Sequence, residues 1–295
     1  MNELVQDRKM RSIILDLQRD EITEHMIYKK IAGAVKDNHN RQVLEEIAIQ
    51  EYEHYLIWKK YTGQEVAPAT LRIWYYYLLA RILGITFAVK LMEGIEKRAQ
   101  NVYHEIGDLI PEVQAIITRE ESHEKKLIAL LDEERLRYMG SVVLGLNDAL
   151  VEFTGSLAGF TFALQDTRII AMAGLIMGIA ASLSMAASEY LSQRSEGGND
   201  GTDPLKASVY TGVAYIITVF LLVLPFLLLE NPYSALVLTL AEAVFVIFIF
   251  TFYLSVAKDL SFRQRFFEMA AISLGIAAIS FAIGMVIRVF LGVNG

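Results

Sequence analysis

Residues 44–58 read LEEIAIQEYEHYLIW, and this stretch decides the fold of the first half of the chain. One set of its residues recurs at alternating steps of three and four: Leu44, Ile47, Glu51, His54 and Trp58. That spacing is helical and places Glu51 and His54 on the apolar face of the helix, which should point into a helix bundle. An unpaired carboxylate on such a face is costly. The pattern therefore predicts that a metal ion neutralises it.

The same pattern returns in residues 113–130, where Glu120 and His123 share an apolar helical face. Two other helical segments carry acids on their apolar faces: Glu21 and Glu24 in the first, Glu93 and Glu96 in the third. Seven residues after Glu21 and after Glu96 comes a tyrosine, Tyr28 or Tyr103. A four-helix bundle brings such groups to one level. Carboxylates with one imidazole per metal suit Fe or Mn better than Zn or Cu, so we expect a di-metal site. Glu24 is the least necessary member, because Glu21 alone could serve the first helix.

The periodicity predicts four helices, at about 10–36, 38–61, 70–105 and 111–138. The third is apolar enough from Ile73 to Met92 to suggest a membrane span, but Arg81 and Lys90 favour a long bundle helix. Its surplus aromatic face, residues 74–77, would then meet either a second subunit or the lipid surface.

Other acids and histidines of this half have a simpler interpretation, because a single Glu-x-x-His pair on a helix is usually solvated. We expect the following to be surface residues: Glu45, Glu46, Glu53, Glu121, Glu124, His25, His39 and His104. Two pairs in the same register, each preceded by a helix with acids on its apolar face, are harder to explain in this way.

Residues from about 10 to 135 resemble the ferritin-like superfamily in its rubrerythrin or erythrin branch. The matching residues are Glu21, Glu51-x-x-His54, Glu93-x-x-Glu96 and Glu120-x-x-His123. The resemblance implies a carboxylate-bridged di-iron site. The chain has no cysteine, so it lacks the ligands of a rubredoxin iron, and disulfides and iron–sulfur clusters are excluded as well.

The second half consists of long apolar runs, at about 140–164, 169–190, 208–229, 235–256 and 268–292. Each is close to or above the roughly 20 residues that cross a bilayer, so we expect five spans. The first residues lack an apolar signal stretch, which favours a cytosolic first domain. Basic residues flank the ends of the spans that would then lie inside: Arg135, Arg137, Arg194, Lys206, Lys258, Arg263 and Arg265. With only Arg168 and Arg288 at the other ends, this bias predicts a cytosolic N-terminus and an outside C-terminus.

Acidic residues inside these spans are the most informative feature of the second half. Asp148 and Glu152 share one face of the first span, Glu189 closes the second, and Glu242 lies inside the fourth. Each costs about 2.5–3.5 kcal/mol at membrane depth on insertion scales, so a plain anchor would have no reason to keep them. Beside these acids, Met185 is a plausible soft ligand on a metal route.

The segments GLNDALVEFTG (145–155) and SMAASEYLS (184–192) are similar to the first span and the end of the second span of the vacuolar iron transporter family. The resemblance covers about 140–295. It implies transport of Fe²⁺ or Mn²⁺ against protons by a dimer, along a route lined by Asp148, Glu152, Met185 and Glu189. Eukaryotic members carry a metal-binding insert between spans two and three, where this chain has only a short loop, Gln193 to Leu205. The fusion as a whole resembles the membrane-bound ferritin-like proteins.

We therefore expect an all-α protein with a ferritin-like four-helix bundle at 1–138 and a five-span membrane domain at 139–295. It would sit in the inner membrane and export Fe²⁺ or Mn²⁺ that the cytosolic di-iron domain captures, senses or oxidises. One alternative is a membrane-tethered di-iron oxidase or peroxidase whose spans are only an anchor. Another is a metal-stabilised dimerisation bundle without redox chemistry. The net charge of −7 argues against a nucleic-acid partner.

Overall fold

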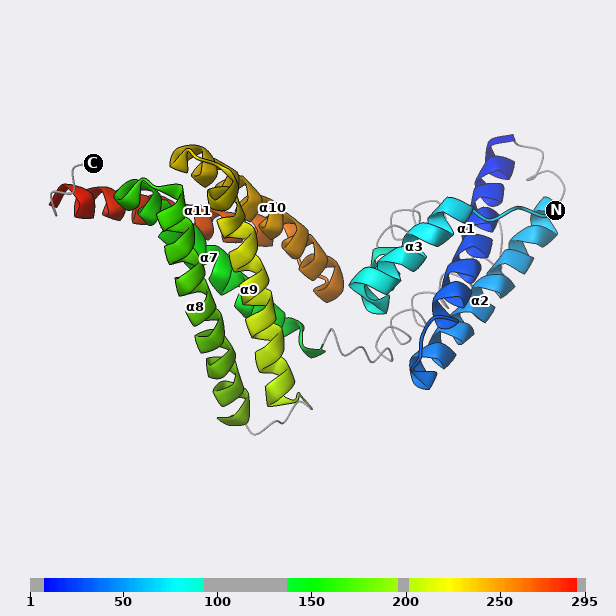
Figure 1. The fold of residues 1–295 in the computed structure, drawn as a ribbon. Coiled ribbons are helices and arrows are strands. Elements are labelled where there is room, and N and C mark those ends of the chain that lie inside the picture. Colours follow the sequence, from blue (N-terminus) through cyan, green and yellow to red (C-terminus); the bar gives the residue numbers. More distant parts are fainter. Residues whose placement is uncertain (1–7, 93–136, 196–201, 291–295) are drawn as a thin grey trace. The chain divides into compact units, whose positions relative to one another are not determined.

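The computed structural model describes residues 8–92, 137–195 and 202–290, and every regular element in these ranges is a helix (Figure 1). The chain divides into two compact units, Met1–Glu133 and Glu134–Gly295. The all-α class is thus confirmed for the described residues.

In the first unit, α1 (Arg8–Ala32) packs along α2 (Asn38–Thr62), and α3 (Thr70–Leu83) packs against α1. The start and end of α2 are both capped. The Asp37 side chain accepts a hydrogen bond from the Asn40 amide at 2.8 Å, and Gly63 ends the helix at a φ of 68°. Ile27 and Leu44 contribute to the core between the helices, and both are almost completely buried. The predicted fourth helix, 111–138, lies almost entirely outside the described residues.

The third helix does not run unbroken from 70 to 105 as expected. It ends at Leu83 because Gly84 has a φ of 106° and a ψ of 156°, a backbone conformation that glycine adopts at little cost. Residues 85–92 are helical again. The apolar segment from Ile73 to Met92 is therefore two pieces, and the first of them, the 14-residue α3, is shorter than the roughly 20 residues that cross a bilayer.

The second unit contains α7 (Met139–Leu164), α8 (Thr167–Ser195), α9 (Pro204–Leu228), α10 (Pro232–Lys258) and α11 (Phe262–Phe290). Asp203 and Asn231 cap α9 and α10, and in both helices a proline occupies the first turn, where its missing N–H is tolerated. Helix α7 packs against each of the other four. It also supplies much of the core, including the fully buried Leu150 and Phe153.

Glycines on α7 and α8 allow the close packing of this unit. Gly155 and Gly159 face α11, where a Cβ would approach Ile276 or Ser280, and Gly178 lies against Val219 of α9 and Phe153 of α7. At Gly145 a Cβ would overlap the backbone carbonyl of Thr211 on α9. The small-residue positions are thus helix–helix contacts within this chain.

Four helices of the described residues are long and apolar enough to cross a membrane: α8, α9, α10 and α11. Helix α7 is long enough, but Asn147, Asp148 and Glu152 interrupt its apolar surface, and it is not among the four. The chain is therefore an integral membrane protein, whereas the expected fifth span remains a prediction.

Candidate metal site

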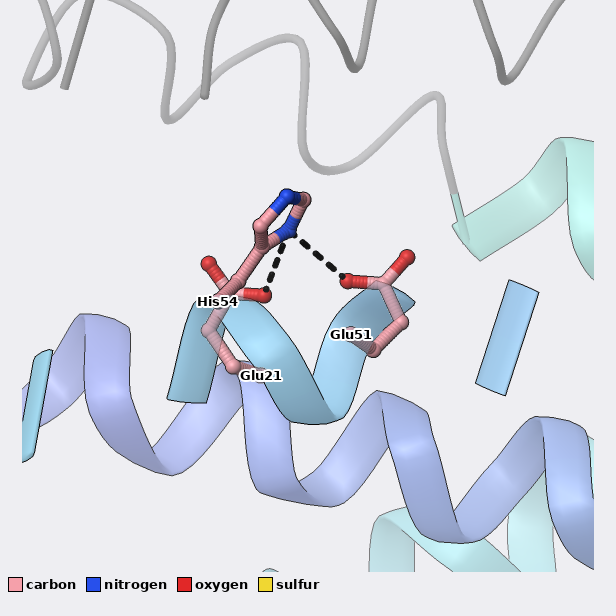
Figure 2. A group of neighbouring side chains, drawn as sticks. All are labelled: Glu21, Glu51 and His54. Atoms are coloured by element: carbon pink, nitrogen blue, oxygen red, sulfur yellow. Dashed lines mark ion pairs between the residues drawn. The ribbon is translucent and has the colours of Figure 1, made fainter. Parts of the chain in front are cut away.

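Three ligand-type side chains meet between α1 and α2: Glu21 from α1, and Glu51 and His54 from α2 (Figure 2). The Nδ1 atom of His54 lies 3.5 Å from Oε2 of Glu21 and 3.5 Å from Oε2 of Glu51. One donor atom from each residue lies within 4.8 Å of the other two. The helical step from Glu51 to His54 puts both on one face of α2, opposite Glu21.

The group is sheltered from water. Glu21 is 2 % exposed and His54 7 %, while the Glu51 side chain retains 15 % of its accessible surface. Two carboxylates this close together in a poorly hydrated place repel each other unless a cation lies between them. A carboxylate–carboxylate–imidazole set is a donor set that suits Fe²⁺ or Mn²⁺, so the residues fit the metal expected from the sequence.

A tryptophan orients one of the carboxylates. The indole Nε1 of Trp58 donates a hydrogen bond to Oε1 of Glu21 at 3.1 Å, and the Trp58 side chain is completely buried. Outer partners fix the orientation of a metal ligand, so Trp58 would hold Glu21 in place at such a site although it cannot itself bind a metal. The helical spacing in the sequence places Trp58 on the apolar face of α2. That spacing does not reveal whether the side chain only fills the core or also donates a hydrogen bond.

A second buried polar layer lies beside this group. The Thr62 hydroxyl donates to Oε1 of Gln18 at 2.6 Å, and the Gln18 amide donates to the backbone carbonyl of Gln64 at 2.9 Å. These bonds connect the end of α2 and the following loop to α1. They hold the two helices in a fixed register next to Glu21, and none of them was expected from the sequence.

Glu24 is not brought into the group of three. Its carboxylate lies 3.3 Å from the Arg72 guanidinium on α3, and Arg72 also pairs with Asp20 at 2.5 Å. Burial raises the pKa of the Asp20 carboxyl, and Arg72 offsets part of that increase. Glu24 therefore helps to connect α1 to α3.

The other half of the expected site, Glu93, Glu96, Glu120 and His123, lies outside the described residues. Within the described residues, Glu45, Glu46, Glu53 and His39 are exposed, as expected. His25 is instead partly buried, and its Nδ1 donates to the backbone carbonyl of Ala48 at 2.6 Å.

In the second unit, the expected route residues lie on α7 and α8. Glu152 accepts a hydrogen bond from the Tyr215 hydroxyl of α9 at 2.6 Å, and Asp148 lies one turn earlier on α7. Glu189 is buried near the end of α8, where Ser141 Oγ donates to it at 2.8 Å and Gln193 Nε2 at 3.1 Å. Met185 packs against the hydrophobic core.

These acids do not form a compact cluster. Among the described residues, the group in the first unit is the only set of three Asp, Glu or His donors close enough for one ion. Glu189 contacts α7 at Ser141, which precedes Asp148 by about two helical turns. Glu189 and the Asp148–Glu152 pair therefore lie at two different levels along α7. Tyr215, Ser141 and Gln193 were not anticipated, because helical periodicity does not reveal which hydroxyl or amide will face a given acid across a helix pair.

Residues 139–200 match the model of the VIT family, the vacuolar iron transporters. The matched segment contains α7 and α8, and with them Asp148, Glu152, Met185 and Glu189. No curated protein matches the chain. The family match and the four apolar helices together support a membrane transporter domain in the second unit.

Proposed function

We propose that this protein transports a divalent metal ion, Fe²⁺ and alternatively Mn²⁺, out of the cytosol in exchange for protons. The observation that carries the proposal is the family match over α7 and α8, the two helices that bear Asp148, Glu152, Met185 and Glu189. We further propose that α7 is the fifth span and that the transporter is a homodimer in the inner membrane with its C-terminus outside.

The first unit would capture the metal. Glu21, Glu51 and His54 supply a sheltered donor set, and Glu93, Glu96, Glu120 and His123 would complete a ferritin-like di-iron site. A di-iron centre supplies redox chemistry, which would let this unit sense or oxidise iron. The chain's own residues hold the donors in place, since Trp58 orients Glu21 and the Thr62–Gln18 bond fixes the helix register.

The acids of α7 and α8 would form the membrane route. Glu189 lies near the end of α8 that carries Arg194, and the positive residues at that end favour its placement at the cytosolic face. Ser141 and Gln193 orient its carboxylate, while Tyr215 orients Glu152 deeper along α7. An ion leaving the capture site would meet Glu189 first and the Asp148–Glu152 pair next.

The proposal is tested with the full chain in proteoliposomes that contain a Fe²⁺-sensitive dye. We expect Asp148→Asn and Glu189→Gln each to reduce Fe²⁺ flux at least about 10-fold, because the loss of a charged ligand costs more than 1.4 kcal/mol in binding. Asp166→Asn is the matched control. Asp166 is exposed and caps α8 through the amides of Arg168 and Ile169, a role that asparagine also fills. Undiminished flux in both route variants would refute the proposed route.

A membrane-tethered di-iron oxidase or peroxidase is the second candidate. The sheltered Glu21–Glu51–His54 group favours it, as does the buried Tyr28 one turn beyond Glu24 on α1. The full chain would then consume O₂ or peroxide in the presence of Fe²⁺, and Glu51→Gln would abolish this turnover. Turnover without any ion flux in proteoliposomes would favour this candidate over transport.

A further inference from the structure

Helix α3 has an apolar face that stays exposed beside the core formed by the described residues of its unit. Five large side chains lie at helical spacing on this face, and they are called the α3 stripe: Leu71, Trp74, Tyr75, Leu78 and Ile82. Their exposed fractions run from 55 % for Trp74 to 89 % for Leu71. The opposite face, with Ile73, Tyr76 and Ala80, is buried in the core of the first unit. A contiguous exposed apolar face of this kind marks a binding surface.

The charges that α3, residues 85–92 and the last turn of α1 place around the α3 stripe are all basic, and of these Arg72 is paired with Asp20 and Glu24 of α1. Residues 70–92 contain Arg72, Arg81 and Lys90 and no acidic residue, although the whole chain has a net charge of −7. The last turn of α1 adds Lys29 and Lys30, and the Lys30 ammonium lies 3.6 Å from the centre of the Trp74 ring. The stripe is therefore an apolar face whose cationic border consists of Lys29, Lys30, Arg81 and Lys90, in a protein of net negative charge.

We propose that the α3 stripe lies on the anionic surface of the bilayer that holds the second unit. Tryptophan and tyrosine with neighbouring lysine and arginine are the residues that proteins place at the level of lipid headgroups. Anionic lipids complement the cationic border. The membrane is always within reach, because the apolar helices of the second unit keep the chain tethered to it.

The geometry of α3 favours lying on the bilayer over crossing it. Its 14 residues give a helix about 21 Å long, whereas the hydrocarbon core is about 30 Å thick. A second copy of the chain is the other possible occupant. A two-fold contact through the stripe would place the cations of one subunit against those of the other, which is unfavourable. The basic residues around the stripe therefore favour contact with anionic lipid over contact with a second copy.

The fluorescence of Trp74 can report on contact between the α3 stripe and lipid. It has two tryptophans, the completely buried Trp58 and the exposed Trp74, and both belong to the first unit. The full chain is placed in nanodiscs of phosphatidylcholine and phosphatidylglycerol, with or without bromine on the acyl chains, and tryptophan fluorescence is measured without metal. We expect bromine to quench the wild-type emission. Trp74→Phe should abolish the quenching, because only the buried Trp58 then remains.

Two results would overturn the proposal: no bromine quenching of the wild type, or equal quenching in wild type and Trp74→Phe. Iodide in the buffer then identifies the surroundings of Trp74. Iodide quenching would mean that the stripe faces water, and protection from both quenchers would mean that a second copy covers it. Arg81→Glu tests the role of charge and should reduce the bromine quenching, with Arg168→Glu in the second unit as the control. Because no metal is present, the result is independent of the transport activity.

Discussion

The hydrogen bond from Trp58 to Glu21 leads us to predict that metal affinity depends on the indole N–H of Trp58. Trp58→Phe keeps the ring in the core but removes the N–H that orients the Glu21 carboxylate. The loss of an outer partner typically weakens metal binding 10- to 100-fold, so we expect at least about a 10-fold weaker Fe²⁺ or Mn²⁺ affinity in the purified full chain. Titration of the metal-free protein measures it.

The control for this experiment is the other tryptophan. Trp74→Phe makes the same chemical change at an exposed position, on α3 rather than at the metal site, and should leave the affinity unchanged. Equal affinities in wild type and Trp58→Phe would show that the indole does not support the site. Thermal unfolding of both variants separates a lost orientation from a lost fold.

In the second unit, we predict that Fe²⁺ flux depends on the hydroxyl of Tyr215. Its buried hydroxyl donates to Glu152, and a hydrogen bond to a charged group contributes about 1.5–3 kcal/mol. We expect Tyr215→Phe to lower Fe²⁺ flux in proteoliposomes about 10-fold while the protein stays folded. Tyr233→Phe is the matched control, because its hydroxyl only accepts a bond from Gln165 at an exposed turn. A flux equal to wild type in Tyr215→Phe would remove Tyr215 from the route.

At the level of helices, Gly145 sets the spacing of α7 and α9. A Cβ there would overlap the Thr211 carbonyl, which is backbone and cannot move aside like a flexible side chain. Overpacking of this kind costs about 1–3 kcal/mol, so Gly145→Ala should lower the unfolding temperature of the detergent-solubilised chain. Gly140→Ala on the same helix has open space around the new methyl group and should be neutral. Similar unfolding temperatures for the two variants would contradict a close contact between Gly145 and Thr211.

The helices themselves were largely predictable, because each has a long periodic or apolar run between clear end signals. The ends of α2 follow from Asp37 and Gly63, and the starts of α9 and α10 from Asp203 and Asn231. Gly84 was missed as a break because an isolated glycine inside a helical pattern is also tolerated there. Only its φ of 106° reveals the break.

The candidate site was predictable where its residues share one helix, and less so where they meet across helices. Glu51 and His54 follow from their spacing, and Glu21 from its place on the apolar face of α1. The ion pair of Glu24 with Arg72 depends on how α3 packs on α1, which no periodicity encodes. The same holds for Ser141 facing Glu189.

For the whole molecule, the candidate capture site and the candidate membrane route lie in different units. A substitution in one should therefore leave the function of the other intact. Glu51→Gln removes one donor from the first unit and leaves the acids of α7 and α8 intact. We expect it to weaken metal binding by that unit and to reduce flux at limiting Fe²⁺. At saturating Fe²⁺ the flux should return to wild type, because capture is no longer limiting. Asp148→Asn should do the reverse, with binding by the first unit retained and flux lost at every Fe²⁺ concentration.

Glu53→Gln controls for the change on α2, since Glu53 is exposed two residues from Glu51 and should behave like wild type in both measurements. Metal content of the purified chain and dye-reported flux are measured on the same preparations. If Glu51→Gln lost flux at saturating Fe²⁺ as completely as Asp148→Asn, the first unit would be part of the route itself. If Glu51→Gln affected neither binding nor flux, the first unit would have no part in metal capture. The flux that Glu51→Gln retains at saturating Fe²⁺ therefore decides whether the first unit only captures the metal or is also part of the transport route.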